Sequence, residues 1–163
     1  MIVIIMGVAG SGKTTIGELL SSRLGYSFAD ADDFHSEANK QKMSCGMALT
    51  DKDRDPWLAA LRTQIEAWLA AHQGGVLCCS ALKASYRLLL GGADRRIRFV
   101  YLRGDESLIR RRLAGRTHHF VNEQLLPSQL AALEEPSETE AIVVDASWHP
   151  EQIVLEIERR LRQ

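Results

Sequence analysis

A glycine-rich segment, Gly-Val-Ala-Gly-Ser-Gly-Lys-Thr at residues 7–14, constrains this chain more than any other feature. It follows an apolar run from Ile2 to Met6 and precedes a helical pattern. The apolar face of that pattern holds Ile16, Leu19, Leu20 and Leu24. This strand–loop–helix setting is the context that the phosphate-loop pattern G-x-x-x-x-G-K-[ST] requires. A plain glycine-rich turn would leave Lys13 and Thr14 unexplained.

The loop predicts that the chain binds a nucleoside triphosphate. Glycines let several backbone N–H groups converge on a polyphosphate, and the helix N-terminus adds a favourable partial charge. Lys13 would reach the β- and γ-phosphates, and the Thr14 hydroxyl would ligate Mg²⁺. The predicted nucleotide-binding residues are Gly7, Val8, Ala9, Gly10, Ser11, Gly12, Lys13, Thr14 and Thr15.

Alternating apolar runs and helical patterns predict an α/β fold. With 163 residues, we expect one domain spanning residues 1–163. The expected strands are Ile2–Met6, Tyr26–Ala29, Val76–Cys79, Phe99–Leu102 and Ala141–Val144. Helices are expected from an Asp55-Pro56 start to about Gly74, over Ser107–Ala114 and over Pro150–Leu161. This order predicts a three-layer sandwich of the phosphate-loop NTPase type, with a five-stranded parallel sheet and helices on both faces.

The amino-acid composition limits the kinds of binding partner and the cellular compartment that we expect for this chain. The net charge is −1, so no overall field favours nucleic acid or an anionic membrane. No apolar segment approaches membrane-spanning length, and no secretory pattern opens the chain. The cysteines are Cys45, Cys78 and Cys79, and the adjacent pair lies in an apolar run typical of inert buried thiols. We expect a reduced, soluble, cytoplasmic protein that binds neither nucleic acid nor membrane.

Ligands of parallel sheets bind beyond the carboxyl ends of the strands, so acidic residues there are candidates for chemistry. Asp30 and Asp32 follow the second expected strand. One could contact Mg²⁺, and the other could accept the proton of an attacking hydroxyl. The alternative is a turn in which both only cap the next helix. Ser80 stands where a Walker B strand would end in Asp, and we expect Asp145 to brace a turn.

The basic segment from Arg112 to Phe120 predicts a mobile lid at about residues 115–126. Arg112 and Arg116 would neutralise charge on the transferred group, and closure would exclude water. The alternative is an ordinary surface loop. GTPase features are missing, because no D-x-x-G follows the loop and Lys42 occupies the Asp position of N-K-x-D. Thr15 stands where a dinucleotide-binding loop needs its third glycine.

Three further stretches carry a resemblance to a known family. They read His35-x-x-x-Asn39-x-x-Lys42-Met43-x-x-Gly46-x-x-Leu49-x-Asp51-x-Asp53-Arg54-x-Pro56-Trp57-Leu58, Cys79-Ser80-Ala81-Leu82-Lys83-x-x-Tyr86-Arg87, and Leu125-Leu126-x-Ser128-Gln129-Leu130-x-x-Leu133-Glu134-x-Pro136. Over nearly its whole length the chain resembles the gluconate kinases, small phosphate-loop kinases related in architecture to shikimate and nucleoside-monophosphate kinases. Ala48 replaces the Pro usual in that pattern.

The resemblance implies transfer of the ATP γ-phosphoryl group to O6 of D-gluconate, by a homodimer. The implied catalytic residues are Lys13, Asp30, Asp32, Arg112 and Arg116, with Thr14 and Asp30 at the metal and the roles of Asp30 and Asp32 open. Asp32, His35, Asn39 and His119 are candidates for substrate contacts, and Lys42, Arg54, Lys83 and Arg87 are candidates for the substrate carboxylate. The alternative is another small-molecule kinase of this fold, acting on shikimate, a nucleotide or a different sugar acid.

Overall fold

The computed structural model describes residues 1–115 and 123–163. Five parallel strands form one sheet in the order β2-β3-β1-β4-β5. The strands are β1 (Ile2–Met6), β2 (Ser27–Asp30), β3 (Gly75–Cys78), β4 (Ile97–Arg103) and β5 (Ala141–Asp145). The order places β1, and so the loop that follows it, at the centre of the sheet. The expected five-stranded parallel sheet is confirmed, with strand ends shifted by one or two residues.

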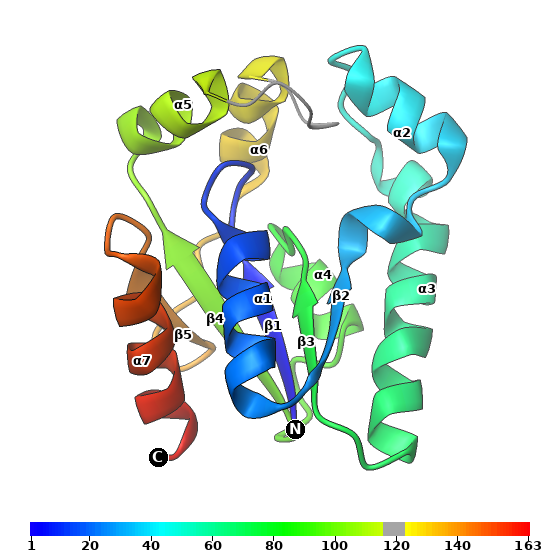
Figure 1. Cartoon of the computed structure of the whole chain (residues 1–163). Helices are drawn as coiled ribbons and strands as arrows, with labels where there is room; N and C mark the ends of the chain where they lie inside the picture. The colour runs from blue at the N-terminus through cyan, green and yellow to red at the C-terminus, as the bar shows by residue number, and fades with distance from the viewer. Residues whose placement is uncertain (116–122) are drawn as a thin grey trace.

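Helices cover both faces of the sheet (Figure 1). They are α1 (Lys13–Leu24), α2 (Glu37–Ser44), α3 (Asp51–Ala70), α4 (Ala84–Leu89), α5 (Glu106–Ala114), α6 (Leu126–Ala132) and α7 (Pro150–Leu161), with short 3₁₀ turns η1 (Ala31–Phe34) and η2 (Glu123–Leu125). The alternation of side chains along β1 divides the core. Ile2, Ile4 and Met6 pack with α3 and α4, whereas Val3 and Ile5 pack with α1 and α7.

A third apolar cluster lies beyond the carboxyl ends of the strands, where α5 and α6 lie over the phosphate loop (Figure 1). Val8 of the loop packs there with Ile109 and Leu113 of α5 and Leu126 of α6. Ile109 and Leu126 are completely buried. This cluster fixes α6 against the loop from above.

The predicted start of the long helix is wrong. Helix α3 begins at Asp51, and Pro56 lies inside it. The Thr50 side chain accepts from the Asp53 backbone N–H, and the Asp53 carboxylate accepts from the Thr50 N–H, so a complete capping box starts the helix one turn earlier. Pro56 has no N–H to donate to the Lys52 carbonyl, yet the helix continues through it to the buried side chains of Trp57 and Leu58.

Among the helices of the described residues, none has the length and apolarity of a membrane span.

The turn after the last strand, β5, has the structure that the sequence predicts. Asp145 accepts a hydrogen bond from the Ser147 N–H at 2.8 Å, so it braces the turn into α7. Helix α7 has the predicted bounds, Pro150–Leu161.

Candidate active site

The phosphate loop joins β1 to α1 and opens into a cavity at the carboxyl edge of the sheet. Gly10 and Gly12 have φ values of 81° and 99°, in the left-handed region that favours glycine. A Cβ on Gly10 would lie 3.0 Å from Leu113 Cγ, so α5 can approach the loop only because this side chain is absent. The loop residues that line the cavity are Ala9, Gly10, Gly12, Lys13 and Thr14.

The Lys13 ammonium folds back over this loop and donates to the Val8 carbonyl at 3.0 Å. Burial lowers the pKa of Lys13, and the Asp32 carboxylate opposes that shift. The Ser11 hydroxyl is buried and has no hydrogen-bond partner within the described part of the chain. A half-buried ammonium and a buried, unsatisfied hydroxyl within a glycine-rich loop are the chemistry that a polyphosphate would satisfy.

Thr14 and Asp30 connect the loop to the end of β2. The Thr14 hydroxyl donates to one Asp30 oxygen at 2.9 Å, and the other accepts from the Asp32 N–H at 3.0 Å. No cluster of three or more metal-ligating His, Cys, Asp or Glu side chains occurs among residues 1–115 and 123–163. A hydroxyl and one carboxylate, both oxygen donors, nevertheless fit Mg²⁺, which keeps several waters and binds substrate phosphates in kinase sites.

Asp32 and His35 line the same cavity as the phosphate loop. The His35 ring stacks on Trp57 with ring centroids 4.5 Å apart, and the Trp57 N–H donates to the Ala31 carbonyl at 2.7 Å. Burial, assisted by the positive charge of Arg54, lowers the pKa of His35 to about 4. Its Nδ1 is buried without a hydrogen-bond partner in the described residues. The neutral imidazole can therefore donate to and accept from a hydroxyl.

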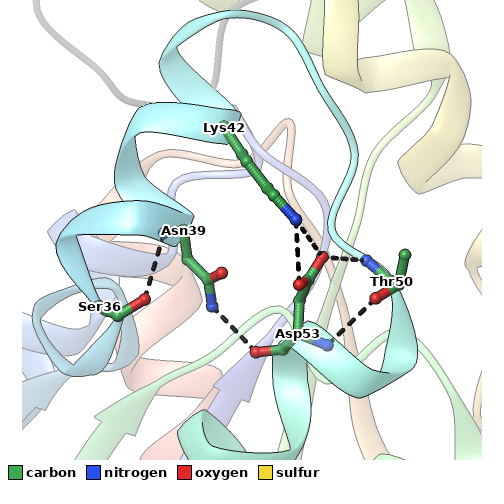
Figure 2. Close-up of polar contacts among 5 residues, drawn as sticks. All are labelled: Ser36, Asn39, Lys42, Thr50 and Asp53. Atoms are coloured by element: carbon green, nitrogen blue, oxygen red, sulfur yellow. Dashed lines mark hydrogen bonds and ion pairs between the residues drawn. The ribbon is translucent and has the colours of Figure 1, made fainter.

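Asn39 and Lys42, both expected to contact substrate, instead connect α2 to the start of α3 (Figure 2). Lys42 Nζ lies 3.1 Å from each Asp53 carboxylate oxygen, and the Asn39 amide donates to the Asp53 carbonyl at 2.9 Å. The Asn39 N–H also donates to the Ser36 hydroxyl, which caps the start of α2. Neither Asn39 nor Lys42 lines the cavity.

Arg54 and Lys83 lie together at a second hollow that adjoins the first. Lys83 donates to Asp51 at 2.8 Å, and this hydrogen bond raises the pKa of Lys83. Asp51 also accepts from the Tyr86 hydroxyl. Arg54 contacts the Tyr86 hydroxyl at 3.4 Å and has no carboxylate within ion-pair distance among the residues described. Arg54 lines both hollows.

Arg87 does not reach the cavity. It is buried, and its guanidinium donates to the carbonyls of Ala81 and Leu82, each at 3.2 Å. Ala81 has a φ of 43°, an uncommon value for a residue with a side chain. Arg87 therefore supports the turn after β3, whereas the sequence suggested a carboxylate contact.

Arg112 contacts the phosphate loop but does not line the cavity that contains Asp32. It belongs to α5, and its guanidinium donates to the carbonyls of Ser11 at 3.1 Å and Ala146 at 2.7 Å. It borders a separate hollow with Thr15, Trp148 and Pro150 among its lining residues. Arg116 and His119 lie outside the described residues. So does most of the predicted lid, of which only Gly115 and the segment from Glu123 onward are described.

Several residues that line the site are not among the candidates that the sequence analysis names for a role in the chemistry. Gln129 on α6 accepts from the Ala9 N–H at 2.7 Å and lines both hollows. Cys78 and Cys79 border the cavity, and burial raises the pKa of both thiols. Cys78 donates to the Lys13 carbonyl at 3.0 Å, which fits its predicted role as an inert thiol. The place of Gln129 and Cys79 in the stretches that resemble the gluconate kinases, and the place of Cys78 at the carboxyl end of β3, are the signals that could have indicated these residues.

A central phosphate loop, a parallel sheet of order 2-3-1-4-5 and polar side chains at its carboxyl edge define a phosphate-loop kinase. The family model for shikimate kinase matches residues 9–162. A gluconokinase of Gluconobacter oxydans (strain 621H) is 43% identical over 160 residues, covering 98% of this chain and 90% of that protein. The chain belongs to the gluconokinase family of these kinases.

Solved structures agree with this assignment. A gluconokinase from Sinorhizobium meliloti 1021 superposes with a TM-score of 0.85 at 41% identity, covering 98% of this chain and 90% of that one. A sugar kinase from Janibacter sp. HTCC2649 superposes with a TM-score of 0.89 at 41% identity, covering 99% and 92%. The α/β kinase fold expected from the sequence is thereby confirmed.

Proposed function

We propose that this chain phosphorylates D-gluconate at O6 with ATP, giving 6-phospho-D-gluconate and ADP. The observation that carries the proposal is one cavity lined by the phosphate loop, by Asp30 and Asp32, and by His35 and Arg54. A kinase needs a phosphate cradle, a carboxylate for the acceptor hydroxyl and groups that recognise the acceptor in one place. The gluconokinase relatives, at about 40% identity over most of the chain, support gluconate as that acceptor.

In this proposal residues 7–15 bind the triphosphate, and Thr14 and Asp30 hold Mg²⁺. The ion would neutralise phosphate charge. The structure supports Asp32 as the residue that orients the O6 hydroxyl and accepts its proton, because Asp32 lines the cavity and its charge acts on Lys13. The Lys13 ammonium would stabilise charge on the transferred group.

We assign the substrate carboxylate to Arg54. Lys42 is paired with Asp53, Lys83 with Asp51, and Arg87 with two backbone carbonyls. Of the four candidate cations, Arg54 has no carboxylate partner in the described part of the structure and faces the cavity. A guanidinium also binds a carboxylate through two parallel hydrogen bonds. His35, which is neutral and lines the same cavity, is assigned to a substrate hydroxyl.

The nucleotide base is assigned to the hollow beyond the loop, beside Thr15, Arg112 and Trp148. Trp148 is 45% exposed, whereas the other two tryptophans are buried. ATP should therefore quench tryptophan fluorescence in the wild type but not in a Trp148→Phe variant. Arg116 and His119 are proposed as further phosphate and substrate contacts, on the family resemblance alone.

The experiment is a coupled ADP-release assay of the purified protein with ATP, Mg²⁺ and a panel of acceptors. We expect turnover with D-gluconate and little with shikimate or nucleoside monophosphates. Asp32→Asn should lower kcat by about 10²-fold or more while ATP affinity changes little. Asp33→Asn, which removes an adjacent exposed carboxylate outside the cavity, is the matched control. Turnover with shikimate but not gluconate would overturn the proposal.

Two broader properties complete the proposal. The family resemblance implies a homodimer, and the composition and cysteine content of the sequence favour the cytoplasm as its compartment. Light scattering at several protein concentrations measures the oligomeric state. A monomer of 18.2 kDa at all concentrations would contradict the proposed dimer. It would not test the proposed activity, which the ADP-release assay tests separately.

A further inference from the structure

Gln129 is the one side chain of α6 that touches the phosphate loop by a hydrogen bond in the described structure. Its carboxamide oxygen accepts from the Ala9 N–H at 2.7 Å, a contact between residues 120 positions apart. Gln129 lines both the phosphate-loop cavity and the adjoining hollow of Arg54 and Lys83. It therefore stands where the phosphoryl side of the site meets the acceptor side.

This hydrogen bond determines which way the carboxamide points. A backbone N–H can only donate, so the oxygen of Gln129 must face Ala9. The NH₂ group then points away from the loop, and it has no hydrogen-bond partner among the residues that the structure describes. Two donors are thus presented at the wall of a site that must bind an oxygen-rich acceptor.

Helix α6 does not need Gln129 to hold its position. Leu126 is completely buried in the cluster with Val8 and Leu113. Beyond the helix, the Glu134 N–H donates to the Leu82 carbonyl at 2.9 Å, and the Glu134 carboxylate accepts from the Ala84 N–H at 2.8 Å. With both ends of α6 anchored by other contacts, a purely structural role does not account for a carboxamide at this place.

We propose that Gln129 is an acceptor-binding residue whose NH₂ group donates to an oxygen of the sugar acid, beside Arg54. The bond to Ala9 holds the carboxamide at a constant position relative to the phosphate loop. The same side chain thereby aligns the acceptor with the phosphoryl group that the loop presents. This inference rests on the proposed function, because it assumes a polyhydroxy acid in the cavity.

Two substitutions of Gln129 distinguish a hydrogen bond to the substrate from a structural contact with the phosphate loop. Gln129→Glu keeps the side-chain length and an acceptor for the Ala9 N–H, but removes the donors. Gln129→Met keeps the approximate volume without charge and removes both functions. Gln73→Glu is the control for added charge, because Gln73 is exposed in the turn before β3, at the opposite edge of the sheet.

We expect Gln129→Glu and Gln129→Met each to raise the KM for D-gluconate by about tenfold or more, the effect of leaving a substrate oxygen without its donor. The KM for ATP should change by less than about threefold in Gln129→Glu, because the contact with Ala9 is kept. Melting temperatures, measured in parallel, should stay close to that of the wild type.

Either of two results would overturn the inference in an active wild-type enzyme. One is a gluconate KM unchanged in both variants. The other is an ATP KM in Gln129→Glu that rises as much as the gluconate KM, which would make Gln129 a support of the loop. Failure of the proposed function is distinguishable, because the wild-type protein itself would then show no turnover with gluconate.

Discussion

Lys42 Nζ lies 3.1 Å from both carboxylate oxygens of Asp53, so the end of α2 is bound to the first turn of α3 (Figure 2). The same Asp53 carboxylate completes the capping box with Thr50. One acidic side chain therefore caps the start of α3 and holds the end of the preceding helix, α2, against it. The Lys42 ammonium is only partly exposed, and this pairing leaves it poorly placed to bind a separate substrate.

We predict that Lys42→Met and Asp53→Asn act on stability more than on acceptor binding. Lys42→Met loses a half-exposed ion pair and should lower the melting temperature by no more than about 3 °C. Asp53→Asn also weakens the cap and should lower it further. Thermal unfolding of both variants and of the double variant measures their coupling. A gluconate KM raised about 100-fold by Lys42→Met alone would contradict this and return Lys42 to the substrate site.

Thr14 and Asp30 should together determine how much Mg²⁺ the enzyme needs for activity. Thr14→Val removes the hydroxyl at nearly constant volume, whereas Thr14→Ser keeps it. We expect Thr14→Val to raise the Mg²⁺ concentration for half-maximal activity by about tenfold and Thr14→Ser to change it little. Magnesium titrations at saturating ATP and gluconate measure this. Equal requirements in Thr14→Val and the wild type would remove Thr14 from the metal site.

His35 should contribute a pH-dependent part of the stability. Its pKa in the folded protein is about 4, below the value near 6.5 of an unfolded chain. Between these values the unfolded state binds more protons, so the contribution is fully present above pH 6.5 and is lost as the pH falls through 4. His35→Phe, which can keep the stack on Trp57, should therefore lose less stability than the wild type from pH 7 to pH 4.5. Urea unfolding at both pH values measures the difference, and parallel losses would refute the assignment.

The three cysteines should differ sharply in reactivity. Cys45 is exposed, whereas Cys78 and Cys79 are buried, and burial raises the pKa of Cys79 to about 12. The thiolate is the reactive form, so a buried thiol with a raised pKa reacts slowly. We expect Ellman's reagent at pH 8 to titrate one thiol per native chain and three after denaturation. Rapid reaction of a second thiol in native protein would show that the end of β3 opens to solvent.

The elements that the sequence predicted well are those with local causes. The β1–loop–α1 unit follows from an apolar run, glycines and a helix start that lie within one stretch of chain. Asp145 and its turn are equally local. The Asp-Pro signal at residue 55 predicts a start of α3 that is one turn too late, because the capping box of Thr50 and Asp53 begins the helix before it. Both signals are local, and the one with two reciprocal hydrogen bonds prevails.

The sequence by itself determined that this chain has a phosphate-binding loop, because glycine dihedrals and backbone N–H groups need only neighbouring residues. It also supplied four cations for one acidic substrate. Only the tertiary structure decided which of them have partners, by pairing Lys42 with Asp53, Lys83 with Asp51 and Arg87 with backbone carbonyls, and this is the basis for proposing Arg54. The physical reason is that the availability of a charge depends on which opposite charges and carbonyls the fold brings within a few ångströms. Those partners lie 5 to 32 positions away in the chain.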